Sequence, residues 1–203
     1  MSEQNSAPKP KRRDRREEIL REATHLFAEH GYQGATLSMI AEAVGLTEPG
    51  VLHYFPSKVH LLQGVLAYRD EKEAEKYAGM LAAQKRDIAE LLGLLEEVYR
   101  ENEKVPGIIQ LFTVLVGESI YPEHPSHDFF VDRYRRERAI YTEQLSMLTD
   151  QTIPPGVSTG ALATLIMAVM DGLHIQWLLD PDRVDLVATY QLFAQMVIEY
   201  LGE

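Results

Sequence analysis

The chain has 203 residues, of which 45% are apolar; it contains no cysteine and carries a formal net charge of −11. The absence of cysteine excludes disulfides and thiolate metal sites within this sequence and fits a reducing compartment. No apolar run approaches the roughly 20 residues of a membrane span, and no apolar segment follows the basic N-terminus as it would in a secretory signal. We therefore expect a cytoplasmic protein of one or two domains.

Charge is distributed unevenly along the chain. Residues 1–60 contain eight basic and eight acidic residues, so the whole negative charge belongs to the remainder. Because an acidic surface repels nucleic acid, only the N-terminal segment remains as a DNA-contacting surface. Residues 1–14 are rich in Lys, Arg and Pro and are expected to form a disordered basic arm. Such an arm is either simply solvated or adds a nonspecific electrostatic contact to DNA.

The N-terminal elements have the order of a helix-turn-helix. Apolar residues at helical spacing predict a first helix that ends near Gly31: Ile19, Leu20, Ala23, Leu26 and Phe27. Thr36 then starts a second short helix and Thr47 a third, with Gly45 in the turn between them. In a helix-turn-helix the second helix of the motif lies in the major groove of DNA. Residues 15–60 are therefore predicted to form a DNA-binding domain.

Residues 61–203 are predicted to be helical throughout and to form a regulatory and dimerisation domain. After a fourth helix that starts at Ser57, apolar periodicity and breaks at Pro and Gly predict helices over 87–103, 106–120, 126–149, 159–179 and 182–201. No segment alternates long enough to form a strand. The sequence therefore predicts an all-α fold of about nine helices: an N-terminal three-helix DNA-binding domain and a C-terminal helical domain.

The last two helices are apolar on more than one face. Helix 159–179 has one stripe through Leu162, Ile166 and Leu173, and another of small and apolar residues that includes Gly172 and Ile175. A helix that is apolar around most of its girth must be covered on both sides. We expect one face to pack in the domain core and the other against an identical subunit. A large monomeric core is the alternative.

Residues 16–62 resemble the N-terminal domain of the tetracycline-repressor-like (TetR) transcriptional regulators. The matching stretch is ILREATHLFAEHGYQGATLSMIAEAVGLTEPGVLHYFPSKVHLL. It has the family's opening Ile-Leu pair, LF followed by HGY, a threonine that starts the second helix, and a closing aromatic-Phe-Pro-Ser-Lys. The resemblance implies a homodimeric DNA-binding regulator whose helical C-terminal domain often holds a small-molecule pocket.

The resemblance and the electrostatics of helix N-termini together predict which residues contact DNA. Helix N-termini offer unpaired N–H groups and partial positive charge to phosphates. The expected contacts come from Thr36, Thr47, Glu48, Pro49, Gly50, His53, Tyr54 and Lys58. Leu52 stands where the family commonly has a phosphate-contacting tyrosine, so that contact is not carried over, and Tyr54 is expected to supply one instead. Thr36 and Thr47 can alternatively serve only as helix caps.

The resemblance also implies a small apolar or amphipathic effector, held among the helices between Tyr68 and Trp177. The expected lining residues are Met80, Tyr99, Phe112, Met167, Met170, His174 and Trp177. Methionine suits an irregular apolar pocket, although Met and aromatic residues at helical spacing are also ordinary core residues. Asp171 and His174, one turn apart, are the most noticeable polar pair. They can equally form a satisfied buried pair or a dimer contact.

The predicted function is a ligand-responsive repressor that binds a palindromic operator as a homodimer. One alternative is a metal-binding helical-bundle enzyme, because the Glu22-His25, Asp171-His174 and His124-His127 spacings can hold metals. The sequence has no phosphate-binding loop, nucleophile elbow or cysteine nucleophile, so we expect no enzyme, cofactor or metal. A second alternative is a DNA-binding regulator with no small-molecule effector.

Overall fold

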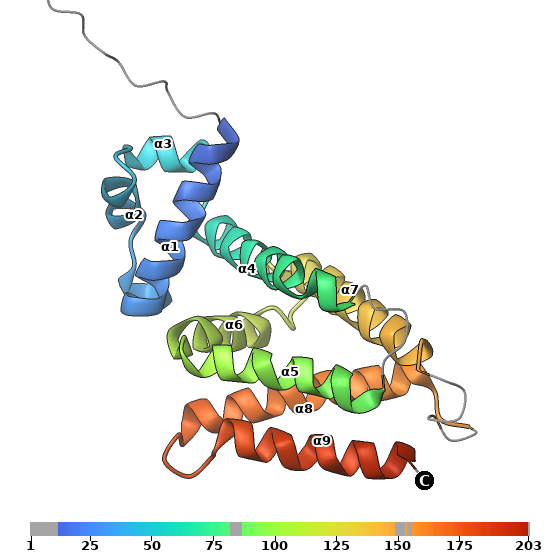
Figure 1. The fold of residues 1–203 in the computed structure, drawn as a ribbon. Helices are drawn as coiled ribbons and strands as arrows, with labels where there is room; N and C mark the ends of the chain where they lie inside the picture. The colour runs from blue at the N-terminus through green and yellow to red at the C-terminus, as the bar shows by residue number, and fades with distance from the viewer. Residues whose placement is uncertain (1–11, 82–86, 149–152, 154–155, 203) are drawn as a thin grey trace, which may run out of the picture. The chain divides into compact units, whose positions relative to one another are not determined.

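The computed structural model describes residues 12–81, 87–148, 153 and 156–202. These residues contain nine helices and no strand, which confirms the all-α prediction (Figure 1). The helices are α1 (Arg12–Gly34), α2 (Leu37–Ala43), α3 (Glu48–Leu52), α4 (Lys58–Leu81), α5 (Ile88–Glu103), α6 (Pro106–Glu118), α7 (His127–Ser146), α8 (Thr159–Leu179) and α9 (Leu186–Gly202).

The chain divides into two compact units, Met1–Arg69 and Asp70–Glu203. The border lies inside α4, whereas the expected border was near the start of that helix. Of the expected basic arm, residues 1–11 lie outside the described residues. Residues 12–14 already belong to α1 rather than to the arm, because helical backbone begins at Arg12.

The first unit is built around buried residues of α1. Ile19, Leu20, Ala23 and Phe27 are each at most 1% exposed. The buried apolar residues of this unit also include Ile40 and Ala41 of α2, Val51 of α3 and Phe55 just beyond α3. The backbone of Gly31 is non-helical (φ 68°, ψ 176°), at the position where the first helix was predicted to end. Gly45, in the turn between α2 and α3, also has positive φ (62°), which a side chain would strain.

Gly64 of α4 sets how closely this helix packs in the first unit. A Cβ atom at this position would lie 2.8 Å from Phe55 Cε1 and 3.0 Å from Leu20 Cδ2. We therefore expect Gly64→Ala to lower the free energy of unfolding by roughly 1–3 kcal/mol, because two buried side chains would have to shift. Urea unfolding followed by circular dichroism would measure the change.

Gly93 of α5 provides the matched control, because a Cβ there would meet nothing within 4 Å. Gly93→Ala should raise the free energy of unfolding by roughly 0.5–1 kcal/mol through helix propensity alone. Equal effects of the two substitutions would show that Gly64 is not needed for close packing.

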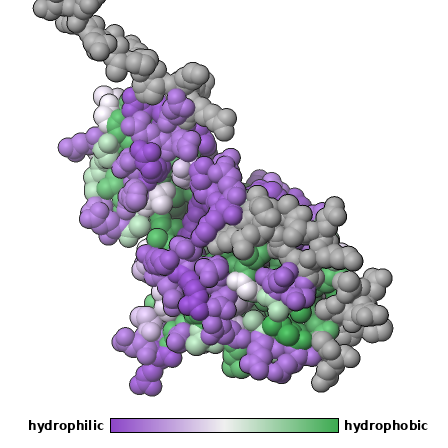
Figure 2. Space-filling view, viewed as in Figure 1, coloured by the Kyte–Doolittle hydropathy of each residue, from purple (hydrophilic) through white to green (hydrophobic). Residues whose placement is uncertain are grey.

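The second unit is a helical bundle in which α5 packs on α9, while α8 contacts α6, α7 and α9 (Figure 1). Its largest buried side chains include Tyr99 and Tyr190, whose rings stack with centroids 4.4 Å apart. The Tyr190 hydroxyl donates to the carbonyl of Leu92 across 2.9 Å and so joins α9 to α5. Figure 2 shows apolar surface among the hydrophilic side chains of this unit.

Among the described helices, α8 alone is long and apolar enough to cross a membrane by length and composition. Core helices of soluble proteins pass the same test, and in this structure α8 packs against three other helices of its unit. Only 28% of its most apolar window is buried within the chain. Much of the apolar surface of α8 is therefore not buried by the residues that the structure describes.

Candidate functional site

The turn between α2 and α3 is held by backbone hydrogen bonds and by two threonine caps. The Gly45 amide donates to the carbonyl of Glu42 across 3.1 Å, and the Leu46 amide donates to that of Ala41 across 2.8 Å. Thr47 Oγ1 accepts from the amide of Gly50 at 3.3 Å and caps α3. These bonds fix the direction in which α3 leaves the turn.

Thr36 caps α2 in the same way, since its Oγ1 accepts from the amide of Met39 at 3.1 Å. Both expected phosphate-contacting threonines therefore act as caps, and both remain exposed at the start of their helices. A cap of this kind leaves the other N–H groups of the first turn available to an anion.

The short helix α3 has one buried side and one exposed side. Val51 is fully buried and Phe55, just beyond the helix, is 3% exposed, so these residues anchor α3 in the first unit. Glu48, Pro49 and His53 are exposed. The structure thus separates the anchoring residues from the predicted base-contacting residues. Gly50 and Tyr54 are half-buried, and the Tyr54 ring meets His53 edge to face at 5.5 Å.

Lys58 begins α4, and its ammonium group faces the end of α1. The Nζ atom lies 4.5 Å from the ring centroid of Tyr32 and 3.5 Å from the carbonyl oxygen of Gln33. Partial burial lowers the pKa of this ammonium from its ordinary value. The contacts orient the side chain, because a cation over an aromatic face is held electrostatically.

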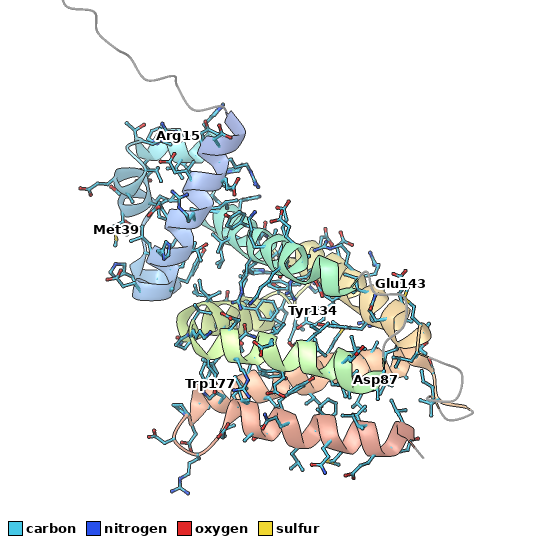
Figure 3. The ribbon with its side chains drawn as sticks, in the orientation of Figure 1. Arg15, Met39, Asp87, Tyr134, Glu143 and Trp177 are labelled. Carbon is cyan, nitrogen blue, oxygen red and sulfur yellow. The ribbon has the colours of Figure 1, made fainter. Side chains whose placement is uncertain are left out.

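Arg15 is a structural contact of this unit that the sequence did not indicate (Figure 3). Its Nη1 donates to Glu18 Oε2 at 2.8 Å and to the carbonyl of Val44 at 3.1 Å. Val44 is the C-cap of α2, so Arg15 ties α1 to the beginning of the turn. Nearby in sequence, the Arg16 guanidinium lies over the ring of Phe55 at 4.9 Å.

In the second unit, several predicted effector residues come together in the apolar core. The Tyr99 ring stacks on His174 with centroids 5.1 Å apart. Met170 and Trp177 are partly buried and pack against the core cluster that contains Tyr99; Figure 3 labels Trp177. Met167 is buried on the same helix as His174, at 8% exposure. These five residues come from α5 and α8.

The other two predicted lining residues, Met80 and Phe112, are not placed in this core cluster by the structure. The side chain of Met80 lies outside the described residues. Phe112 of α6 contacts Phe130 edge to face at 5.6 Å and lies under the guanidinium of Arg133 at 4.7 Å. Phe112 therefore belongs to a different cluster, centred on α6 and α7.

Asp171 and His174 are one turn apart, but they have different partners. Asp171 Oδ2 accepts from the Tyr134 hydroxyl at 2.7 Å. His174 Nε2 lies 3.0 Å from Asn102 Nδ2, in a pair that is buried on both sides. Sequence reasoning missed Tyr134 and Asn102, because a tyrosine in the charged run DRYRRER and an asparagine among glutamates suggest solvent-exposed positions.

Next to Tyr134, Arg133 forms a bidentate ion pair with Asp70 of α4. The distances are 2.7 Å from Nε to Oδ2 and 2.8 Å from Nη2 to Oδ1. Burial disfavours the charged guanidinium, but the hydrogen bonds and charge of Asp70 outweigh this and raise the pKa of Arg133. Both side chains are about one-fifth exposed, at 18% and 19%.

Burial raises the pKa of Asp171, although the bond from Tyr134 and the charge of Arg133 partly oppose this. The folded protein therefore binds this proton more tightly than the unfolded chain does. The ionised carboxylate accordingly costs stability, and this cost sets in as the pH rises through the folded-state pKa.

We expect Asp171→Asn to gain stability relative to the wild type as the pH is raised from about 4 to about 8, because the amide cannot ionise and still accepts from Tyr134. Urea unfolding across this range would measure the difference. Asp182→Asn, at an exposed position, is the control and should show no such trend. A pH-independent difference for Asp171→Asn would contradict the assigned cost of ionisation.

Comparison with known families bears on both units. Residues 19–65 match the family model described as bacterial regulatory proteins of the tetR family. Residues 124–202 match the model of the C-terminal region of BetI-type transcriptional repressors. The chain belongs to the TetR family. It is therefore a DNA-binding transcriptional regulator, as the helix-turn-helix predicted.

Individual relatives of this TetR-family chain are distant. The nucleoid occlusion factor SlmA of Idiomarina loihiensis is 23% identical over 79% of this chain and 82% of its own length. The structure of SmeT, the repressor of the Stenotrophomonas maltophilia multidrug efflux pump SmeDEF, superposes with a TM-score of 0.71 at 19% identity, covering 91% of this chain and 89% of SmeT. A transcriptional regulator from Saccharomonospora viridis in complex with choline gives a TM-score of 0.68 at 23% identity, covering 91% and 95%.

TetR-family proteins are transcriptional regulators rather than enzymes, and they act on DNA as dimers. Neither the family nor the fold therefore supports the alternative function, a metal-binding helical-bundle enzyme. In the part of the chain that the structure describes, no three His, Asp or Glu side chains are grouped as a metal site would require.

Proposed function

We propose that this TetR-family protein is a ligand-responsive repressor that binds a palindromic operator as a homodimer. The observation that carries the proposal is the construction of α3, which is anchored by Val51 and Phe55 and exposes Glu48, Pro49 and His53. In the major groove, a glutamate can accept from a cytosine amino group and a proline can contact a thymine methyl. Gly50, without a side chain, would permit close approach to base edges.

Phosphate contacts are proposed for the residues around α3. The first turns of α2 and α3, at Thr36 and Thr47, present amide groups and partial positive charge to anions. Tyr54 and Lys58 would add a hydroxyl and a charge. Such contacts fix the register of the protein on the duplex and carry no sequence information themselves.

Dimerisation is proposed through α8 and α9. Each helix leaves large apolar side chains exposed, with exposed fractions from 44% to 80%: Leu165, Ile175 and Leu179 on α8, and Leu192, Met196 and Tyr200 on α9. An isologous four-helix interface would cover them, because two-fold dimers are the commonest soluble assemblies. A soluble dimer of this kind would work in the cytoplasm.

A small apolar or amphipathic effector is proposed to bind within the second unit. The support is the set of polar side chains in its apolar core, at Tyr99, Asn102, Tyr134, Asp171 and His174. The likeness to a choline-bound regulator and to a repressor of a multidrug pump supports small-molecule control. The 23% identity to a nucleoid occlusion factor favours a second candidate, a DNA-binding protein controlled by something other than a small effector.

Selection of bound duplexes from a random DNA pool tests the proposal. The expected product is a palindrome whose half-sites lie one or more helical turns apart. Enrichment of no sequence would refute specific recognition. A subsequent screen for compounds that release the selected DNA separates the two candidates, since only the first requires such a compound.

Lys58→Met is expected to weaken operator binding and to reduce the slope of log affinity against log salt concentration by about 1.8, because the dimer loses one phosphate contact in each subunit and each contact releases about 0.9 counterion. Fluorescence anisotropy at several salt concentrations would measure the slope. Lys104→Met, at a side chain that is 66% exposed in the second unit, serves as the control and should leave the slope unchanged. An unchanged slope for Lys58→Met would mean that the ammonium of the wild-type Lys58 stays over the Tyr32 ring and does not contact a phosphate.

A further inference from the structure

The second unit contains a carboxylate whose charge no cation of the described residues neutralises directly. Asp171 accepts one hydrogen bond, from the neutral Tyr134 hydroxyl. The cation whose charge opposes the raised pKa of Asp171 is Arg133, and its guanidinium donates from Nε and Nη2 to Asp70. Because the Arg133–Asp70 pair is neutral as a whole, Asp171 retains a net negative charge when it is ionised.

A second polar group close to this charge lacks a partner. The Tyr99 side chain is 0% exposed, and its hydroxyl has no hydrogen-bond partner among the described residues. Burial raises the pKa of this hydroxyl, and the Tyr190 and Asp171 side chains add to the effect. Buried hydroxyls are nearly always hydrogen-bonded in native structures, so the Tyr99 hydroxyl calls for a partner beyond the described residues, such as a water or a ligand.

The surroundings of these two groups are aromatic and adaptable. Tyr99 stacks on His174, Tyr134 reaches Asp171, and Trp177 packs partly buried against the same core. Aromatic faces attract organic cations, particularly where water is excluded. Met167 and Met170 lie on the same helix as Asp171, and methionine side chains are flexible enough to fit an irregular ligand.

We propose that Asp171 is the counter-ion of a cationic effector, an amphiphilic organic ammonium compound, and that the Tyr99 hydroxyl is its second polar contact. This inference rests on the proposed control by a small effector and specifies the chemistry of that effector. An anion would be repelled by Asp171, and a purely apolar ligand would leave the carboxylate without a counter-ion and the Tyr99 hydroxyl without a hydrogen-bond partner. An ammonium group would balance the charge of Asp171, and a hydroxyl on the same apolar body would hydrogen-bond the Tyr99 hydroxyl.

Calorimetric titration of the full chain with three probes of nearly equal shape tests the assignment. The probes are (4-hydroxyphenyl)trimethylammonium, its uncharged isostere 4-tert-butylphenol, and the anion 4-tert-butylbenzoate. The expected order of affinity is cation over neutral isostere by about tenfold, with the anion weakest, because one desolvated cation contact is worth roughly that factor. Asp171→Asn should abolish the preference for the cation, and Asp182→Asn, the exposed control, should retain it.

Tyr99→Phe adds a readout that a purely structural role would not produce. Because the hydroxyl has no partner in the described chain, its removal should leave the unfolding midpoint unchanged or raised. The same change should weaken binding of the cationic probe. A loss of stability without a loss of binding would overturn the role assigned to Tyr99.

The outcomes separate this inference from the proposed function. Binding of no probe, equal binding of cation and isostere, or a cation preference that survives Asp171→Asn would each overturn the counter-ion assignment. If the isostere or the anion binds and releases the selected operator, effector control stands and only its assigned chemistry fails. Calorimetry does not depend on DNA, so a failed operator selection would refute the repressor while the counter-ion test still gives a result.

Discussion

The double substitution Leu165→Glu and Met196→Glu should convert the dimer into monomers and lower operator affinity by at least about a hundredfold. The two side chains are 55% and 61% exposed on α8 and α9, and the proposed interface would bury them. A carboxylate placed there would be desolvated without a partner in each subunit. A monomer engages only one half-site and loses the effective concentration that a second head provides, which is worth about 10²–10⁴ in affinity.

Sedimentation equilibrium and operator titration would measure the two effects together. Ile120→Glu is the matched control, because Ile120 is 72% exposed but follows α6 rather than lying on α8 or α9. This variant should remain dimeric and bind the operator normally. A double variant that stays dimeric, or a monomer with unchanged operator affinity, would contradict the proposed interface.

Arg133→Met is expected to cost roughly 3 kcal/mol of the free energy of unfolding, because it leaves the Asp70 carboxylate largely buried without its partner. This loss is at the low end of the range for buried pairs, because the two side chains are 18% and 19% exposed. The same change removes the guanidinium from the ring of Phe112, 4.7 Å away. Chemical denaturation of the dimer at fixed protein concentration would measure the loss.

The exposed pair Arg135–Asp132 provides the control for this substitution. Its atoms approach to 2.6 Å, yet its side chains are 70% and 61% exposed. Arg135→Met should therefore change stability by less than about 1 kcal/mol. Adding Asp70→Asn to Arg133→Met should restore part of the loss, because the uncompensated charge disappears. Equal costs for Arg133→Met and Arg135→Met would show that the buried pair has no special role.

Local features of this fold could be predicted from the sequence, whereas distant contacts could not. The caps at Thr36 and Thr47 and the positive φ of Gly45 depend on neighbouring residues, and a hydroxyl or glycine at a helix end indicates them. The apolar period likewise placed each long helix. Gly64 looked like an ordinary helical glycine, because only the folded chain brings Phe55 against it.

In the second unit, too, some contacts could be predicted from the sequence and others could not. Tyr99 and His174 were expected to face one interior, and the structure stacks them. Whether they bind a ligand stays a prediction. The Arg133–Asp70 pair joins residues 63 positions apart, and nothing in either local sequence indicates which charge is buried. Pairings of this kind are decided by how the helices pack, and a single sequence does not reveal that packing.

The two sides of helix α8 make different contacts, and this arrangement bears on cooperativity between the two subunits of a dimer. One side holds Asp171 and His174 against neighbouring helices of the same chain, and the other exposes Leu165, Ile175 and Leu179. In the proposed dimer, joined through that outer side, α8 would lie between each proposed effector position and the other subunit. An effector that shifts α8 in one subunit would then alter the effector affinity of the other subunit, and its saturation curves would depart from a simple hyperbola.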